Sequence, residues 1–325
     1  MATAVTNQAA TSVHTMQCME VWGGNGEMDS GVTMPGVDAW VYSRPWKGEQ
    51  HGGDIHYVSS CGTGRIGRIL VADVAGHGEK VSALAITLRN LMRRYVNYVD
   101  QAQFVEMMNK EFLAVSEGGR FATALVATYF APTNTLDAVN AGHPRPLVYS
   151  STRKEWYILR EIEAPEDSEA TNLPLGIMEE SRYKVFSLRM KPGDLVVIYT
   201  DSLLEAQGAD GRQLGEEGLL DVIRRVDRSN PSAFAKLFAE GVIERSGGVH
   251  PDDDLTILLL RPNGLAAKMT VGEAMAAQWK FWRMVLGSWR KGAPPVPWPE
   301  LSLANILGPF GDRFQKNYGA NAKDV

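Results

Sequence analysis

Short apolar runs and longer amphipathic segments follow one another along this chain in a definite order. The first half predicts three strands and then a pair of helices. The strands are expected over residues 37–42, 54–59 and 65–74. Apolar residues then recur at three- and four-residue steps from Val81 to Tyr95, which predicts a helix with one apolar face. The second helix is expected over residues 102–115.

The second half of the chain predicts more strands and a further helix pair. Strands are expected over residues 121–130, 135–140, 146–149, 155–159, 183–188, 194–199 and 255–260. Helices are expected over residues 214–226 and 231–246. Because single strands do not alternate with single helices, the order disfavours a doubly wound parallel sheet. Two sheets packed face to face, with helix pairs outside, satisfy it.

The two ends of the chain differ from this central part. Residues 1–32 are rich in Gly, Thr and Met without a clear period, so we expect an irregular N-terminal lead-in there. Residues 33–262 form the expected central domain. Residues 263–325 hold four of the eight tryptophans, and Trp279, Trp282 and Trp289 share one helical face. A helical, Trp-rich C-terminal extension is therefore expected.

Three roles are open for this C-terminal extension. The first is packing of the tryptophan stripe against the central domain. The second is docking to a partner protein, because Trp, Met and Arg are enriched in interface cores. The third is an interfacial membrane helix, which the prolines at 294, 295, 297 and 299 argue against.

The composition limits the partners and the compartment. Hydrophobic residues make up 44% and charged residues 22% of the 325 residues, which is typical of globular proteins. The net charge of -5 gives no reason to expect a nucleic-acid partner. With only Cys18 and Cys61, a disulfide framework is not expected and a reducing compartment fits. Neither a signal-peptide pattern nor an apolar run of ~20 residues occurs, so we expect a cytoplasmic protein without membrane attachment.

One glycine pattern matches a dinucleotide-binding motif without its structural context. Residues 62–67 match the G-x-G-x-x-G pattern of dinucleotide-binding proteins, which requires a helix to open at the last glycine. Here the glycines lead into the strand expected over residues 65–74, so a hairpin turn fits better. We therefore exclude a dinucleotide site.

Aspartates stand at the ends of four expected strands. Asp54 begins one strand, Asp73 ends another, Asp201 follows a third, and Asp253 and Asp254 precede the last. For any one of them a turn-forming role is the simpler interpretation. Together, carboxylates at one sheet edge would repel each other unless a cation neutralised them. Oxygen ligands without clustered Cys or His point to Mg²⁺ or Mn²⁺, and two such ions about 3.5–4 Å apart suit hydrolytic phosphoryl chemistry.

Six motifs occur in an order that resembles a known family. They are Gly-Gly-Asp at 52–54, Asp-Val-Ala-Gly-His-Gly at 73–78, Asn-Ala-Gly-His-Pro-Arg-Pro at 140–146, Leu-Pro-Leu-Gly at 173–176, Tyr-Thr-Asp-Ser-Leu-Leu-Glu-Ala at 199–206 and Asp-Asp-Leu-Thr at 253–256. Together they resemble the stage II sporulation protein E/RsbU-type branch of the protein phosphatase 2C-like, metal-dependent phosphatases. The resemblance covers about residues 33–262.

This resemblance implies a fold and a metal centre. The implied fold class is α+β, a four-layer α-β-β-α sandwich of two antiparallel sheets flanked by helix pairs. The implied cofactors are two divalent cations, Mn²⁺ or Mg²⁺, bridged by Asp73 with the carbonyl of Val74 as a further ligand. Asp201 and Asp253 would complete the dinuclear site, and Asp54 would act through one metal or its water. Asp254 would support these ligands without binding a cation itself.

Other residues of the motifs have less defined roles. His77 is a candidate general acid, because the pKa of histidine suits proton transfer near neutrality; an exposed turn residue is the alternative. His143 is expected to pack a tight turn. Arg44 and Arg145 are candidate phosphate contacts that we leave outside the core site. Ser202 occupies a position where the family usually has glycine, which predicts altered loop packing with metal binding retained.

The implied reaction is hydrolysis of phosphoserine or phosphothreonine on a signalling protein by a metal-bridging water. The substrate would be a phosphoprotein such as an anti-sigma-factor antagonist or a response-regulator-linked protein. One alternative is a catalytically inactive phosphatase-fold binding or regulatory module, although every expected aspartate is present. Another is a phosphomonoesterase for small, non-protein substrates.

Overall fold

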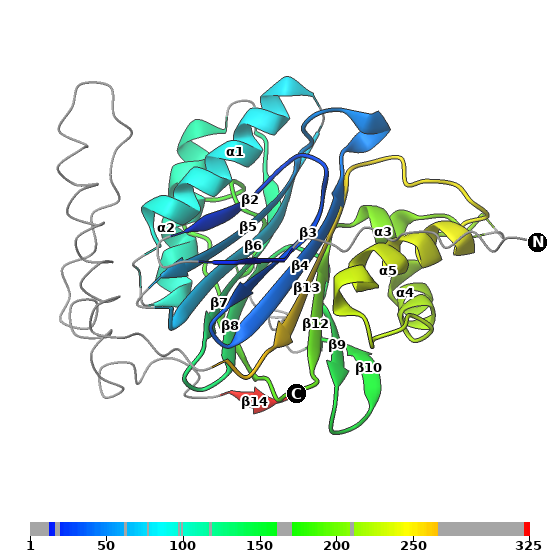
Figure 1. Ribbon diagram of the computed structural model, residues 1–325. Helices are drawn as coiled ribbons and strands as arrows, with labels where there is room; N and C mark the ends of the chain where they lie inside the picture. Colours follow the sequence, from blue (N-terminus) through cyan, green and yellow to red (C-terminus); the bar gives the residue numbers. More distant parts are fainter. Residues whose placement is uncertain are drawn as a thin grey trace, which may run out of the picture.

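Two seven-stranded sheets form the centre of the computed structural model (Figure 1). The structure describes residues 13–16, 20–61, 64–76, 78–96, 98, 100–116, 119–160, 171–208, 211–265 and 322–325. The first sheet has the strand order β1 (Val13–Thr15), β3 (Met28–Met34), β4 (Val37–Arg44), β13 (Leu255–Pro262), β12 (Leu195–Tyr199), β9 (Leu147–Ser150) and β10 (Glu155–Ile158). The second has the order β14 (Lys323–Asp324), β11 (Phe186–Arg189), β8 (Thr135–Ala141), β7 (Ala122–Phe130), β6 (Ile66–Val74), β5 (Asp54–Cys61) and β2 (Val21–Gly24).

Pairing within both sheets is almost entirely antiparallel. The exceptions among the described strands are the short edge pairs β1–β3 and β11–β14, which are parallel. Sequence-distant strands meet at the centre of the first sheet, where β13 pairs with β4 on one side and with β12 on the other. The centre of the first sheet is therefore built from segments that lie far apart in the sequence.

Helices cover the outer faces of the two sheets. On the second sheet lie α1 (Glu79–Arg94) and α2 (Gln101–Val115), whose N-terminus is capped by the Asp100 side chain accepting from the Gln103 amide at 2.9 Å. On the first sheet lie α4 (Gly215–Ile223) and α5 (Pro231–Arg245), together with the one-turn α3 (Ser202–Glu205). A short 3₁₀ helix, η1 (Trp46–Gly48), follows β4.

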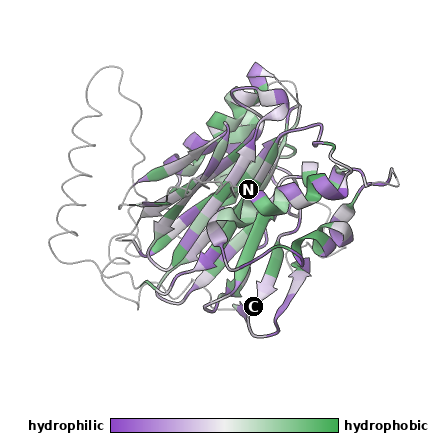
Figure 2. Ribbon diagram, turned by 45° about the vertical axis from the view of Figure 1, so that its right-hand side comes forward, coloured by the Kyte–Doolittle hydropathy of each residue, from purple (hydrophilic) through white to green (hydrophobic). Residues whose placement is uncertain are grey.

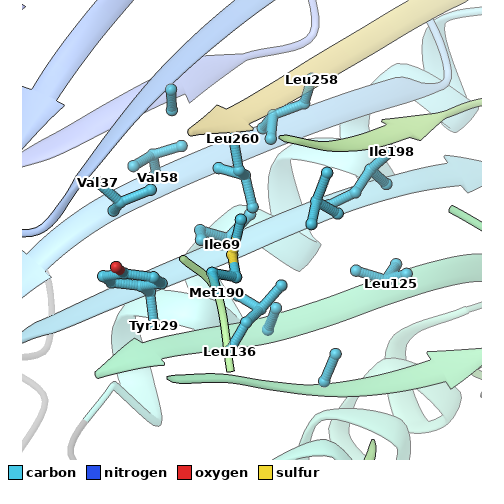
Figure 3. Packing of buried hydrophobic residues seen from close by; sticks show 14 of the residues in the cluster. Val37, Val58, Ile69, Leu125, Tyr129, Leu136, Met190, Ile198, Leu258 and Leu260 are labelled. Carbon is cyan, nitrogen blue, oxygen red and sulfur yellow. The ribbon is translucent and has the colours of Figure 1, made fainter. Parts of the chain in front are cut away.

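Three apolar clusters separate these layers. The central cluster lies between the sheets and includes Val58, Ile69, Leu125, Ile198 and Leu258 (Figure 3). A second cluster joins the first sheet to α4 and α5, and a third joins the second sheet to α1 and α2. The layer order is therefore helix, sheet, sheet, helix, as the family resemblance implied.

This layering explains the apolar runs in the sequence. In β12, Val196 and Ile198 face the central cluster, whereas Leu195, Val197 and Tyr199 face the helices. Both faces are covered, so no polar alternation is needed. Figure 2 shows the result, with hydrophobic residues concentrated along the strands and hydrophilic residues distributed over the outer helices.

The fully buried Arg68 fixes the connection between α1 and α2. Its guanidinium donates to the Gln101 side chain at 3.1 Å and to the Val96 and Tyr98 carbonyls, and it lies 4.8 Å from the centre of the Phe104 ring. Neutral oxygens thus satisfy a buried cation and hold this connection against the sheet.

The two ends of the chain differ from the sequence-based expectations or lie outside the described residues. The irregular lead-in expected over residues 1–32 is wrong for the described residues there, because β1, β2 and most of β3 lie in this range. Long-range pairing with β4 and β5 outweighs the weak local preference of a Gly-, Ser- and Thr-rich segment. The helical extension expected after residue 263 falls almost entirely outside the described residues. Among the described helices, none has the length and apolar character needed to cross a membrane.

Candidate metal centre

The second sheet places two of the predicted aspartates side by side. The register of β5 and β6 pairs Asp54 directly with Asp73, and β7 places Thr123 on the other side of Asp73. Side chains of directly paired residues project from the same face of a sheet. Asp54 is only 4% exposed, so its carboxylate is almost completely removed from bulk water.

The first sheet contributes the remaining aspartates from one end of two adjacent strands. The β12–β13 ladder continues past Tyr199 through a hydrogen bond from the Thr200 amide to the Thr256 carbonyl at 3.0 Å. Asp201 follows directly and is the residue before α3, whereas Asp253 and Asp254 precede β13. Because the strands are antiparallel, the end of β12 and the start of β13 meet at the same edge.

Two side chains join the sheets at this edge. The carboxylate of Asp254 accepts hydrogen bonds from the amides of Trp46 at 2.7 Å and Gly53 at 2.5 Å. The Thr200 hydroxyl donates to Asp54 Oδ2 at 2.8 Å. These bonds bring the aspartates of the two sheets into one cluster.

The glycines that precede Asp54 are required by close approach of neighbouring atoms. A Cβ atom at Gly52 would lie 2.3 Å from Asp254 Oδ2, and one at Gly53 would lie 3.1 Å from the carbonyl oxygen of Val74. Any larger residue at 52 would displace the Asp254 carboxylate. The Gly-Gly-Asp motif therefore has a steric reason at the cluster.

Burial and mutual repulsion raise the pKa values of these carboxyls. Burial raises the pKa of Asp73 to about 7, with further contributions from the charges of Asp201, Asp253, Asp254 and Glu205. The pKa of Asp54 is raised well above its ordinary value by burial and then by the Asp73 and Asp254 charges. Thr200 and Thr256 oppose this rise in the pKa of Asp54 by hydrogen bonding.

The aspartates of the first sheet show the same tendency. Burial raises the pKa of Asp201, and the charge of Glu205 raises it further. Burial also raises the pKa of Asp253, assisted by the charges of Asp254 and Asp201. The cluster thus concentrates negative charge that water does not fully screen.

These residues fit divalent cations by their chemistry. All of the donors are oxygens, and raised carboxyl pKa values mark a place where a positive charge would stabilise the ionised forms. Within the described residues, however, no three His, Cys, Asp or Glu side chains converge into a preformed cation cage. The carboxylates are close enough to repel one another without forming such a cage in this arrangement.

The structure gives positions for three of the four remaining predicted residues. Val74 is buried at the end of β6, with its carbonyl oxygen facing Gly53. His77 lies outside the described residues. Ser202 opens α3 and is buried in a helical position that does not require glycine. Asp254 receives backbone amides on both of its oxygens, which suits a supporting residue.

Two residues left outside the core site have defined contacts. Asn140 holds the turn around His143, since its side chain accepts from the His143 amide at 2.6 Å and donates to the His143 carbonyl at 2.8 Å. The His143 ring is buried and lies 3.0 Å from the Thr123 hydroxyl. Arg145 forms a two-pronged ion pair with Glu216, so its guanidinium is already engaged.

Sequence reasoning missed Thr200 and Glu205. Both lie in the Tyr-Thr-Asp-Ser-Leu-Leu-Glu-Ala motif. The helical spacing of Asp201 and Glu205 was an available signal, because residues four apart share one face of a helix. No sequence signal pointed to the hydroxyl of Thr200, which bonds residue 54 across 146 positions.

Replacing Thr200 by valine is expected to destabilise the metal-free protein by about 1–3 kcal/mol. The Thr200 hydroxyl accepts from the Thr256 amide at 2.9 Å while donating to Asp54. Valine has nearly the same shape as threonine, so the substitution opens no cavity. It leaves the buried Thr256 amide and the buried Asp54 carboxylate without their hydrogen bonds to the Thr200 hydroxyl. Urea unfolding in chelator at pH 7 measures the change.

Thr200→Ser is the matched control for this substitution. Serine keeps the hydroxyl and loses one methyl group, so its expected cost is about 1 kcal/mol or less. Equal destabilisation by valine and serine would contradict a role for the hydroxyl.

Known proteins resemble this chain in sequence. The model of the family described as Stage II sporulation protein E (SpoIIE) matches residues 64–263. Phosphoserine phosphatase RsbU of Bacillus subtilis is 24% identical over 195 residues, which cover 59% of this chain and 55% of RsbU. The chain thus spans about half the length of this relative.

Solved structures show the same fold. The phosphatase domain of B. subtilis SpoIIE, solved with a fragment of its regulatory domain, matches with a TM-score of 0.57 and 16% identity. That match covers 76% of this chain and 64% of the other. RsbX in complex with magnesium matches with a TM-score of 0.53 and 16% identity, covering 73% of this chain and 100% of RsbX.

Proposed function

Because this chain belongs to the stage II sporulation protein E family, we propose that it is a metal-dependent protein serine/threonine phosphatase. The proposed reaction is hydrolysis of phosphoserine or phosphothreonine on a signalling protein. The proposed cofactors are two divalent cations, Mn²⁺ or Mg²⁺.

One observation carries this proposal. Four aspartates from two different sheets, Asp54, Asp73, Asp201 and Asp253, gather at one edge, where burial and the charges of neighbouring carboxylates raise their pKa values. Such an arrangement costs stability in the absence of a cation, so a structural role alone does not account for it. A phosphatase of this family would use the arrangement to hold its metals.

The proposed roles follow the positions of the residues. Asp73, Asp201 and Asp253 would bind the cations directly, with the Val74 carbonyl as a further ligand. Asp54 would act through one cation or its water. Asp254 positions the Gly52–Gly53 turn through the Gly53 amide, and His77 is the proposed general acid.

Bound cations would neutralise charge on the phosphate oxygens and lower the pKa of water at the site. The protein's own residues supply the rigidity of the site. Thr200 fixes one oxygen of Asp54, and Asp254 fixes the backbone that leads into Asp54. Both bonds cross between the sheets, so the geometry of the site depends on how the sheets pack.

The proposed substrate is a phosphorylated partner protein. The relative RsbU is a phosphoserine phosphatase by name, and this supports a phosphoprotein substrate for the present chain. An anti-sigma-factor antagonist or a response-regulator-linked protein is the proposed class of partner. The residues from 263 onward are proposed as a segment that can dock such a partner.

The test is turnover on p-nitrophenyl phosphate and on a phosphothreonine peptide, with added Mn²⁺ or Mg²⁺ and with EDTA. Metal is expected to raise turnover at least about tenfold over the chelated protein, because the carboxylates alone repel a phosphate dianion. Circular dichroism spectra of the chelated sample serve as the folding control.

No turnover with either cation, from folded protein, would overturn the proposal. A catalytically inactive phosphatase-fold binding module would then explain the chain better. Turnover confined to the small ester would instead indicate a phosphomonoesterase for non-protein substrates.

A further inference from the structure

A groove with a volume of about 480 Å³ lies between the β3–β4 hairpin and α5, and we refer to it as the β4–α5 groove. Its volume lies in the range of roughly 300–1,000 Å³ that is usual for ligand sites. The charged side chains that line it and carry the argument are Glu27, Asp29, Arg44, Lys236, Glu240 and Glu244.

One end of the β4–α5 groove adjoins the carboxylate cluster. Arg44 lines the groove and pairs in register with Leu255, which directly follows Asp254. Just beyond Arg44, the Trp46 amide donates to Asp254 Oδ1 at 2.7 Å. The Arg44 end of the groove is therefore the end nearest to the proposed metal centre.

The charge of the groove is unbalanced. Four carboxylates face two permanent cations, and no ion pair joins any of these six side chains to another described residue. Glu240 and Glu244 are exposed and lie four positions apart on α5, so they share one face of this helix. Unpaired acids along a cleft attract positively charged groups from solution.

Tyr42 supplies a hydrogen-bonding group at the wall of the groove. Its side chain lines the groove although only 8% of the residue is exposed. Its ring belongs to the cluster between the first sheet and α5. No hydrogen bond from its hydroxyl to another described residue is seen. A nearly buried phenol with a free hydroxyl is suited to bond the backbone or a side chain of a ligand.

We propose that the β4–α5 groove binds the polypeptide next to the phosphorylated residue of the substrate and selects substrates with Lys or Arg in that flanking segment. The inference rests on the proposed function, because it places the flank of a phosphoprotein beside the catalytic residues. Glu240 and Glu244 provide the selection, and Arg44 lies at the end nearest the phosphate.

The test compares two phosphothreonine peptides that differ only in having lysine or glutamate on both flanks. The kcat/KM of the protein with Mn²⁺ is expected to be about tenfold higher for the lysine peptide. The double variant Glu240→Lys, Glu244→Lys should reduce this ratio to about one or invert it. Both residues are exposed on α5, so folding should be preserved. Turnover of p-nitrophenyl phosphate should be unchanged, because this ester has no flanking segment.

Glu180→Lys is a single-charge-reversal control away from the groove, because Glu180 is an exposed acid next to Glu179, whose carbonyl faces Asn109 of α2 on the opposite sheet. This control should keep the wild-type preference. Equal kcat/KM values for the two peptides, or a lysine preference that survives the double variant, would overturn the inference while leaving the proposed function intact.

Fluorescence anisotropy of the two labelled peptides separates this inference from failure of the proposed function. Absence of turnover on every substrate would overturn the proposed phosphatase function. Binding of the peptides would still test the inference in that case. If wild type binds the lysine peptide more tightly than the glutamate peptide, and the double variant binds the lysine peptide about tenfold more weakly, the groove does select basic flanking residues. Equal binding of both peptides would overturn it.

Discussion

Turnover of a phosphothreonine peptide by Asp73→Asn is expected to be at least about 100-fold below that of the wild-type protein at saturating Mn²⁺. Asp73 lies at the centre of the cluster, since it pairs with Asp54 in the second sheet and senses the charges of Asp201 and Asp253 from the first. Losing a residue that merely supports a metal ligand already costs about 10–100-fold in metal affinity or activity, so losing the proposed bridging ligand should cost more. Steady-state kinetics over a range of Mn²⁺ concentrations measures the loss.

Asp221→Asn is the control for this substitution. Asp221 is 57% exposed on α4, where its only described ion pair is with Arg224, and its substitution should leave kcat/KM unchanged. Retention of more than a tenth of wild-type turnover by Asp73→Asn, at any Mn²⁺ concentration, would show that Asp73 does not hold the catalytic cation.

The same substitution is expected to stabilise the metal-free protein near pH 7, by about 2–4 kcal/mol. The pKa of Asp73 rises from 3.8 to about 7 on folding, and each pKa unit corresponds to about 1.4 kcal/mol. Asparagine carries no charge, so it removes the cost of burying a carboxylate and the repulsion from Asp201 and Asp253. At about 2–4 °C per kcal/mol, Tm should rise by about 4–16 °C.

The pH dependence of stability shows whether Asp73→Asn stabilises the protein by removing a charge or because asparagine packs better than aspartate. A carboxyl whose pKa is raised in the folded state binds its proton more tightly there than in the unfolded chain. Wild-type stability without metal should therefore fall as the pH rises from about 4 to 7, the window between the unfolded and folded pKa values of Asp73. In Asp73→Asn this fall should be much smaller.

Urea unfolding at pH 5 and pH 7.5, with EDTA present, tests the stability prediction. Asp221→Asn should follow the wild-type pH dependence. Adding Mn²⁺ should stabilise wild type by about 2.7 kcal/mol at a hundredfold excess over Kd, and should stabilise Asp73→Asn less. If the free energy of unfolding decreased equally with pH in wild type and in Asp73→Asn, the raised pKa of Asp73 would not explain the stability change.

The sequence predicted the central elements because their patterns are local. The stripe of Val81, Leu88 and Met92 on α1 follows from burial of one helix face, and the apolar run of β12 follows from burial of both faces of the strand. Strands β2 and β3 were missed because Gly23, Gly24 and Gly31 weaken any strand signal. Their pairing with β5 and β4 is a long-range property.

The candidate site could be predicted in part for the same reason. Aspartates at strand ends can be recognised from the sequence, and the structure brings Asp54, Asp73, Asp201 and Asp253 to one edge. The metal-binding roles assigned to them stay predictions. The contacts of Thr200 and Asp254 could not be foreseen, because each depends on the packing of one sheet against the other.

The bonds that join the sheets also determine when the site can form. Gly53 and Asp254 lie 201 positions apart, and Asp54 and Thr200 lie 146 apart. Closing loops of this length is slow compared with forming local helices such as α1. A chain leaving the ribosome could pair β5 with β6 early, yet the carboxylate cluster would stay incomplete until residue 254 had emerged. Metal affinity should therefore be among the last properties acquired during synthesis and refolding, which makes it a sensitive reporter of complete folding.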